Sequence, residues 1–103
     1  VILPCADKKF SYLHRGTKNL AFRLPSKKKL IRLLKKTGPV IAPSANMEGL
    51  LPSTTIQEAK DYFEDEVDFY VPGGKLESLP STIVAIKNGK LSIKRQGALI
   101  IKN

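Results

Sequence analysis

The sequence is poor in the residues from which disulfides, metal sites and nucleophilic catalytic centres are usually built. It has one cysteine, Cys5, and one histidine, His14, in 103 residues. A single cysteine excludes an intrachain disulfide, and a clustered metal site is equally unsupported. Cys5 has no evident base near it, and neither a P-loop nor a G-x-G-x-x-G motif occurs. We therefore expect no catalytic nucleophile, no metal ligand and a cytoplasmic location.

Long apolar runs are also lacking. No stretch approaches the roughly 20 residues that cross a bilayer, and Val1–Pro4 do not show the basic and apolar regions of a signal peptide. We expect no membrane partner and no secretion. Hydrophobic residues make up 42% and charged residues 26%, which is the composition of a folded chain rather than a disordered one.

Acidic residues are few relative to basic ones. The chain has 18 Lys and Arg against 9 Asp and Glu, a formal net charge of +9. Such a charge favours polyanionic partners, either nucleotide phosphates or RNA. Scattered lysines that only keep a surface hydrated explain the same number. Charge alone does not choose between these readings.

Strand-like and helix-like segments alternate along the chain, which predicts one α/β layered domain, or part of one, over residues 1–103. Ser26 and the Thr55/Glu58 capping box mark two helix starts, and Gly38 with Pro39 marks a helix end. The expected strands are 1–3, 19–24, 40–42 and 67–71, and the expected helices are 27–36 and 55–64. The segment before residue 19 is polar and is expected to be a loop.

The clearest local element is a hairpin over residues 82–95. Asn88-Gly89 has the signature of a type I′ turn between two alternating runs. If Lys87 faces Lys90, then Ile86 faces Leu91, Val84 faces Ile93 and Thr82 faces Arg95. This register gathers a guanidinium and the hydroxyls of Ser81 and Thr82 at one end of the sheet, where a phosphate could bind.

Other polar residues are interpreted more simply. Ser44 and Asn46, which follow the expected strand 40–42, are typical of turns as well as of ligand sites. His14 is expected to be an exposed loop residue. Gly73-Gly74 permits either a turn or the close approach of a ligand. The acidic residues form a solvated turn rather than a metal site; they are Asp61, Glu64, Asp65, Glu66 and Asp68.

Several motifs in register resemble those of the YrdC-like family of threonylcarbamoyl-AMP synthases. Residues 43–49 with Thr54-Thr55 resemble its S-A-N-x-S-G…T-T signature. Gly73-Gly74, the run 80–84 and Arg95-Gln96-Gly97 resemble its G-G, S-T-hydrophobic-hydrophobic and R-x-G elements, and residues 20–25 resemble its V-x-x-R-x-P strand. Asn19 stands where the family usually has Thr, and Glu48 where it has Ser.

The resemblance implies a YrdC/RibB-like α+β fold, a three-layer α/β/α arrangement around a twisted mixed sheet. The chain would be the C-terminal portion of that single domain, truncated at its N-terminus, because the family's K-x-R half has no counterpart before Val1. The implied activity is that of a nucleotidyltransferase that joins threonine, bicarbonate and ATP, with Mg²⁺, for partner proteins that modify tRNA. We expect weak stability and no synthase activity from this piece alone.

Carried over position by position, the resemblance also implies binding residues. Those for ATP are Asn19, Ser44, Pro52 and Arg95, and those for threonine are Arg23, Ala42 and Ser81. No catalytic residue and no metal ligand is implied.

Three alternatives stay open at the level of sequence. One is the YrdC-like domain of a hydrogenase-maturation carbamoyltransferase, which activates a carbamoyl group with ATP. Another is a non-catalytic module that binds double-stranded RNA or tRNA through the basic helix 27–36. The third is a degenerate remnant without activity.

Overall fold

The computed structural model describes residues 1–102 and divides them into two compact units. The sheet unit comprises Val1–Leu33 and the chain from Leu79 onward, and the loop unit comprises Leu34–Ser78. The boundary falls inside the helix α2 (Lys28–Thr37). No helix in the described part of the chain has the length and apolar character to span a membrane.

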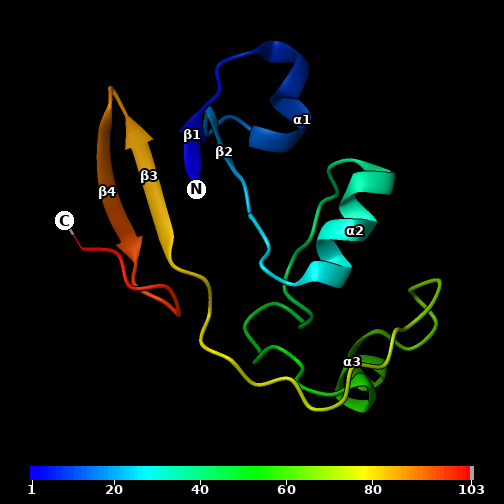
Figure 1. Ribbon diagram of the computed structural model, residues 1–103. Coiled ribbons are helices and arrows are strands. Elements are labelled where there is room, and N and C mark those ends of the chain that lie inside the picture. Colours follow the sequence, from blue (N-terminus) through cyan, green and yellow to red (C-terminus); the bar gives the residue numbers. More distant parts are fainter. Residues whose placement is uncertain (103) are drawn as a thin grey trace. The chain divides into compact units, whose positions relative to one another are not determined.

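The sheet unit is built on a four-stranded mixed sheet with the order β2-β1-β3-β4 (Figure 1). Its strands are β1 (Ile2–Pro4), β2 (Asn19–Ala21), β3 (Ile83–Lys87) and β4 (Lys90–Arg95). β1 pairs antiparallel with β2 and parallel with β3, and β3 pairs antiparallel with β4. The first strand of the chain therefore lies beside one that begins about eighty residues later. A mixed sheet with separate helices confirms the α+β class.

β2 is shorter than the predicted strand 19–24. Its pairing with β1 ends at Phe22, whose N–H donates to Val1 O at 2.7 Å, while the Val1 ammonium group donates to Phe22 O at 2.7 Å. Beyond Phe22, no strand among residues 1–102 pairs with this segment. A strand needs a neighbour for its backbone groups, so the apolar alternation up to Leu24 continues without forming one.

The segment before β2 is helical in part, so the predicted loop is wrong there. A 3₁₀ turn (η1, Lys8–Phe10) leads into a short helix α1 (Ser11–His14). Asp7 caps the start of the 3₁₀ turn, because its carboxylate accepts the N–H of Lys9 at 3.0 Å. The prediction for His14 is also wrong: the side chain is 8% exposed, and its Nδ1 accepts the N–H of Gly16 at 3.1 Å.

The β3–β4 hairpin confirms the type I′ turn, since Asn88 and Gly89 have φ of 50° and 70°. The pairs that follow from the turn are confirmed as far as Val84↔Ile93. The last predicted pair is wrong, because a bulge between Ile83 and Val84 places Ile83, not Thr82, opposite Arg95. A bulge inserts one residue into one strand and so shifts the register beyond it.

The helices α2 and α3 (Ile56–Phe63) lie within about a residue of their predicted positions. At the end of α2, Gly38 has φ of 77° and donates its N–H to Leu34 O at 2.8 Å, which is a left-handed cap. At the start of α3, the Thr55 hydroxyl accepts the N–H of Glu58 at 3.2 Å. α3 ends at Phe63 with Glu64 as its C-cap, which agrees with the predicted end near Glu64.

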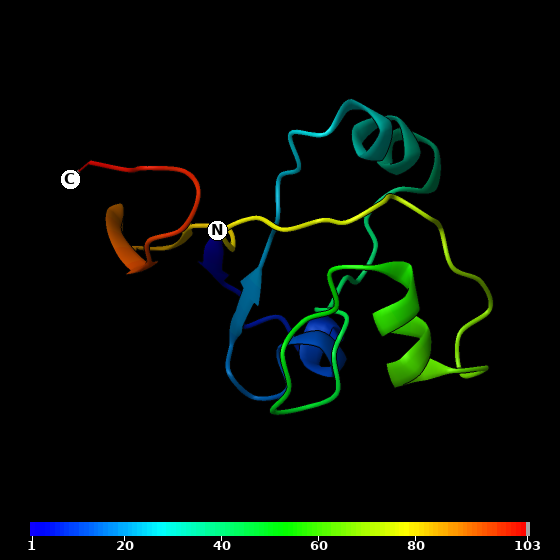
Figure 2. The ribbon, with the colours of Figure 1, turned by 90° about the horizontal axis from the view of Figure 1, so that it is seen from below.

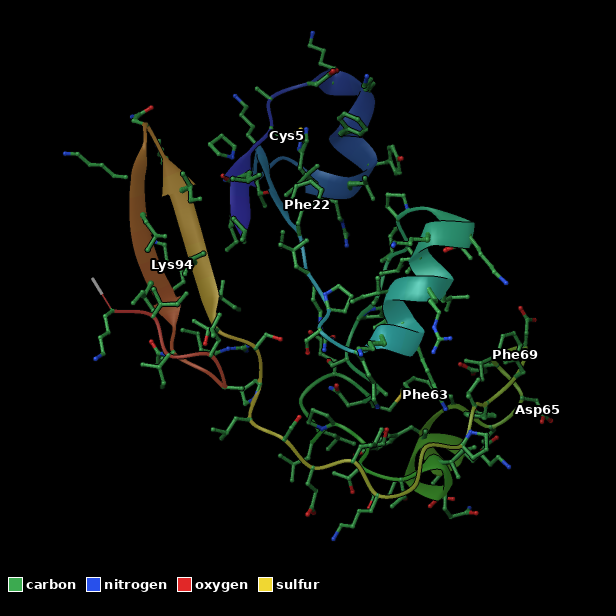
Figure 3. All side chains as sticks on the ribbon, viewed as in Figure 1. Cys5, Phe22, Phe63, Asp65, Phe69 and Lys94 are labelled. Carbon is green, nitrogen blue, oxygen red and sulfur yellow. The ribbon has the colours of Figure 1, made fainter. Side chains whose placement is uncertain are left out.

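Two predicted strands are absent from the described chain: Val40–Ala42 and Val67–Val71 are both irregular. Ile41 is 78% exposed and Phe69 is 76% exposed, so neither segment is buried. Apolar character favours a strand only where a neighbouring strand satisfies the backbone, and none pairs with these segments among residues 1–102. Figure 3 shows Asp65 and Phe69 in the segment after α3.

Little of the described chain is fully buried. Val84 on β3, which is 6% exposed, is the one buried apolar side chain among residues 1–102. The remaining apolar residues are partly or largely exposed. The sheet is therefore held mainly by its backbone ladders, with a small apolar contribution around Val84.

Candidate functional site

Polar groups converge where β3 begins and β4 ends. Arg95 donates from Nε and Nη2 to the Ser81 carbonyl, at 3.2 and 2.9 Å. The Thr82 hydroxyl accepts the N–H of Gly97 at 2.9 Å and donates to Leu99 O. We call this set of five residues the sheet-end cluster: Ser81, Thr82, Arg95, Gly97 and Leu99.

Gly97 is what lets the two segments of the cluster approach each other. It is buried, and a Cβ atom built on it would lie 2.6 Å from the Ser81 carbonyl carbon and 2.7 Å from the Thr82 nitrogen. The next residue, Ala98, donates its N–H to Pro80 O at 3.0 Å. Any residue larger than glycine at position 97 would push the segment after β4 away from the start of β3.

The Arg95 guanidinium has donors to spare. It carries five N–H groups, and the bonds to Ser81 O use two of them. The side chain is exposed, and the ion pairs found in residues 1–102 do not involve it. A held, exposed guanidinium without a carboxylate partner is suited to binding a phosphate.

Charge is strongly divided between the two units. The sheet unit carries fourteen Lys and Arg against the single acid Asp7, whereas the loop unit carries four against eight acids. The excess of positive charge in the sheet unit attracts anions to it over distances of about 10 Å at 0.1 M salt.

The sheet register also places the other predicted site residues of this unit. Ala21, Ile2, Ala85 and Ser92 lie in one row across the sheet. Arg23 follows Ala21 in the direction of the sheet-end cluster. Arg23 and Ser81, both predicted to bind threonine, therefore share one end of the sheet with Arg95.

Asn19 lies at the opposite end of the sheet, toward the hairpin turn, because it pairs with Pro4. Its side-chain amide donates to Thr17 O at 2.7 Å. The structure thus joins Ser81 with Arg95 and does not bring Asn19 to them.

The remaining predicted residues lie in the loop unit. Ala42, Ser44 and Pro52 are all exposed. Ser44 and Pro52 belong to the loop 43–55, and Ala42 directly precedes it. Ser53 closes this loop, because its N–H and its hydroxyl both donate to Ala45 O, at 2.8 and 2.9 Å. Figure 2 shows this loop beside α3, to which Tyr62 ties it by donating to Leu51 O at 2.9 Å.

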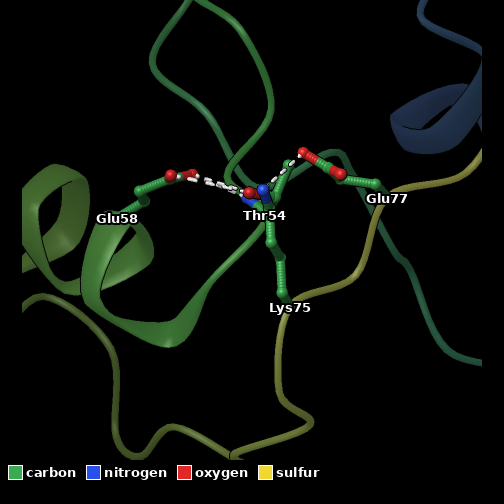
Figure 4. A network of polar contacts seen from close by, with 4 residues as sticks. All are labelled: Thr54, Glu58, Lys75 and Glu77. Atoms are coloured by element: carbon green, nitrogen blue, oxygen red, sulfur yellow. Dashed lines mark hydrogen bonds and ion pairs between the residues drawn. The ribbon is translucent and has the colours of Figure 1, made fainter.

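A hollow of about 240 Å³ opens beside this loop. The segment 71–76 forms one wall, and Leu76 donates its N–H to Thr54 O at 2.8 Å. In Figure 4, Glu58 accepts the Thr54 N–H at 2.8 Å, and Lys75 pairs with Glu77 at 3.1 Å. The lining residues are Ala45, Ser53, Thr54, Thr55, Ile56, Ala59, Tyr70, Val71, Gly73, Gly74 and Leu76.

Asn46 has an unsatisfied atom in the same loop. Its Nδ2 donates to Met47 O at 2.9 Å, but its Oδ1 is buried and accepts no hydrogen bond. Buried polar atoms are nearly always paired, so an acceptor of this kind indicates a group that a donor could satisfy. Asn46 was visible in the sequence as part of the Ser-Ala-Asn run.

Tyr70 in the loop unit has a raised pKa. Partial burial raises its pKa above 10.0, and the carboxylates of Asp65, Glu64 and Glu66 raise it further. Its hydroxyl donates to Glu64 O at 2.7 Å. Tyr70 therefore stays neutral and acts as a hydrogen-bond donor at neutral pH.

Metal ligands do not gather in the part of the chain that the structure describes. Groups of three or more His, Cys, Asp or Glu side chains with suitable positions are absent from residues 1–102. The acidic residues 61–68 are exposed, which agrees with the solvated turn predicted for them. These residues do not fit a dedicated Mg²⁺ site, which needs close oxygen ligands.

Two residues of the sheet-end cluster, Gly97 and Leu99, were not predicted as site residues, whereas the hydroxyl of Thr82 was predicted at this end of the sheet. The sequence showed Thr82 and Gly97 within motifs, but their joint role depends on the bulge and on the return of residues 97–99 along the start of β3. A glycine directly after the last residues of a strand was the available signal.

Comparison with known proteins gives a consistent result. Residues 1–97 match the Sua5/YciO/YrdC family model, which is described as telomere recombination. The chain is 31% identical over 94 residues to a threonylcarbamoyl-AMP synthase of Pseudoalteromonas translucida (strain TAC 125), across 87% of this chain and 49% of that protein. The chain thus spans about half the length of this curated relative. No solved structure matches the chain at a significant level.

Proposed function

Because the chain belongs to the Sua5/YciO/YrdC family, we propose that it supplies the C-terminal part of a threonylcarbamoyl-AMP synthase. The relative in Pseudoalteromonas translucida carries that name. The observation that best supports the proposal is the exposed Arg95 guanidinium, which the Ser81 carbonyl holds at the end of a strongly basic sheet unit.

In the proposed reaction the amino group of threonine and bicarbonate form a carbamate with loss of water. A carbamate oxygen then attacks the α-phosphorus of ATP, the bond to the β-phosphate breaks, and pyrophosphate leaves. Arg95 would neutralise charge on the phosphate oxygens, with Ser44 and the backbone near Pro52 close to the nucleotide. Such a transfer needs positioning and charge stabilisation rather than a protein nucleophile, which suits a chain without one.

Threonine would be held by Arg23, Ser81 and the backbone of Ala42. Arg23 offers a guanidinium for the amino-acid carboxylate. Asn19 lies away from Arg95 in the sheet register, so it belongs to the nucleotide site only through the resemblance. The carbamoyl-transferring relatives within the family would use the same phosphate contacts and differ in the acceptor.

Mg²⁺ would enter with ATP, bound to its phosphates. tRNA-modifying proteins that consume the product are the expected partners, in the cytoplasm. Each of these statements rests on the family.

The test is a chimera in which this chain replaces the matched part of the Pseudoalteromonas relative. Pyrophosphate release that needs both threonine and bicarbonate is expected from the chimera and not from this chain alone. Arg95→Ala should lower the rate at least about 100-fold, as loss of a charge-stabilising donor does.

The matched control is Lys94→Ala, which removes one positive charge from the adjacent position of β4, a residue labelled in Figure 3. It should change the rate less than about twofold if only general charge is lost. An active parent with an inactive, folded chimera would contradict the proposal, and so would equal effects of the two substitutions.

RNA binding is the second candidate function. The observation that favours it is the set of basic residues on and before α2, which are exposed and form no ion pair in the described chain: Lys27, Lys28, Lys29, Arg32, Lys35 and Lys36. Fluorescence anisotropy with labelled tRNA, at 50 and 200 mM salt, would measure it.

If RNA binding is the function, changing the three lysines 27–29 to Gln should weaken affinity and reduce the salt dependence. The control changes Lys87, Lys90 and Lys94 to Gln, the same charge on the hairpin. RNA binding by this chain together with no ATP binding by the chimera would favour the RNA-binding module over the synthase.

A further inference from the structure

One contact in the sheet-end cluster does more than close the fold. The Thr82 hydroxyl both accepts the Gly97 N–H and donates to Leu99 O, so a single side-chain atom fixes two points of the segment after β4. Within that segment, Gln96 Nε2 donates to the same Leu99 carbonyl at 2.7 Å and so stiffens it. The segment 96–99 is thereby held against the start of β3.

The orientation of Arg95 depends on this same contact. Its guanidinium is held through the Ser81 carbonyl, which lies directly before Thr82. Ala98 donates to Pro80 O, so residues 80–82 and 97–99 fix each other from both sides. The bulge at Ile83/Val84 removes Thr82 from the pair with Arg95 and leaves its hydroxyl free for Gly97.

We infer that Thr82 is a positioning residue for anion binding by Arg95: its hydroxyl locks the Ser81 carbonyl in the place where it orients the guanidinium. An arginine side chain that is already ordered loses less conformational freedom when a phosphate binds. Thr82 itself touches no ligand in this assignment. The role of the bound anion rests on the proposed function, whereas the orientation of Arg95 does not.

The first experiment follows solvent exchange of the Arg95 Nε–H by NMR in the ¹⁵N-labelled chain without ligand. The signal is assigned by its loss in Arg95→Lys. Thr82→Val keeps the shape of threonine but lacks the hydroxyl, and it should speed the exchange about fivefold or more, as loss of hydrogen bonds does. Thr82→Ser, which keeps the hydroxyl, should restore the exchange rate of the wild type.

Gly97→Ala provides an independent variant, because it keeps the Thr82 hydroxyl and pushes the segment away by its Cβ. It should speed the exchange as Thr82→Val does. If the amide signals of β1 and β2 show that both variants unfold, Gln96→Ala, at an exposed position, is measured in their place. It should speed the exchange of the Arg95 Nε–H by a smaller factor. An Arg95 Nε–H that exchanges as in the wild type in a folded Thr82→Val or Gln96→Ala chain overturns the inference.

The second experiment titrates MgATP, and inorganic pyrophosphate separately, into the chimera and its Thr82 variants. Thr82→Val should weaken both affinities about tenfold, and Thr82→Ser should leave them within about twofold. If no variant binds either anion while Thr82→Val still speeds exchange, the proposed function fails and the positioning of Arg95 stands. If the chimera binds ATP and Thr82→Val binds it equally well, the positioning role fails and the proposed function stands.

Discussion

At the scale of single residues, the side chains whose role the structure explains are those that form hydrogen bonds with backbone groups. Arg95 and Thr82 act on carbonyl and amide groups of neighbouring segments, and His14 receives the Gly16 N–H inside α1 and its loop. Motif order in the sequence was enough to select Arg95 and Ser81. It was not enough to predict that the Ser81 contact uses its carbonyl rather than its hydroxyl, since that depends on the register shift between β3 and β4.

Tyr70 gives a pH prediction at this scale. Because its pKa is raised in the folded state, the folded chain holds the phenolic proton more tightly than the unfolded chain does. The resulting stabilisation is complete below pH 10.0 and is lost as the pH rises through the higher folded pKa. Thermal unfolding of the wild type should therefore lose more stability between pH 9 and 11 than that of Tyr70→Phe, which lacks the titrating hydroxyl.

The difference between the two proteins is what matters, because every other titratable side chain is common to both. Lys60, whose Nζ lies 5.7 Å from the centre of the Tyr70 ring, is present in each. Parallel profiles of stability against pH for the wild type and Tyr70→Phe would show that the surroundings of Tyr70 do not raise its pKa.

At the scale of elements, local signals predicted the helices α2 and α3 and the hairpin turn, which satisfy their own backbones, but missed η1 and α1. The Thr55 N-cap of α3, the glycine after α2 and the Asn-Gly turn are confirmed because their hydrogen bonds join residues a few positions apart. The second bond of the predicted capping box goes one residue further back, because Glu58 accepts the N–H of Thr54 rather than that of Thr55. The strands 40–42 and 67–71 were wrong because a strand depends on a neighbour that its own sequence does not name.

The hairpin turn gives the prediction at this scale. Gly89 has φ of 70°, a conformation that costs any residue with a Cβ roughly 1 kcal/mol or more. Gly89→Ala should therefore destabilise the hairpin by about 1 kcal/mol, measured as about fivefold faster amide exchange in β3 and β4. Asn88→Gly, at the neighbouring left-handed position, is the control and should change the exchange little. An equal effect of the two would mean that the turn conformation does not hold this register.

At the scale of the whole molecule, exposed apolar surface and divided charge dominate. Leu24, Ile41, Leu51, Phe69 and Val71 are each at least 75% exposed, against one buried apolar side chain, Val84, in residues 1–102. Burial of apolar area is the main source of folding free energy, so this chain has little to oppose its conformational entropy.

The prediction at this scale is a low free energy of unfolding for the chain alone. Urea should unfold it at a low midpoint with a small slope, and the dye ANS should fluoresce strongly on it. In the chimera described above, the ANS signal per molecule should fall several-fold as apolar surface becomes covered. A cooperative transition at high urea, with no ANS binding by the chain alone, would contradict this expectation.

The sequence by itself determined the helices α2 and α3, the type I′ turn and its nearest pairs, and the family motifs, because each depends on residues close together in the chain, and it determined the excess of basic charge by composition alone. Only the tertiary structure decided that β1 lies beside β3, that His14 is buried, that a bulge shifts Arg95 away from Thr82, and that Gly97 lets residues 97–99 return along residues 80–82. These features depend on pairing and close packing between segments far apart in the sequence. Neither periodicity nor motif spacing encodes such contacts directly.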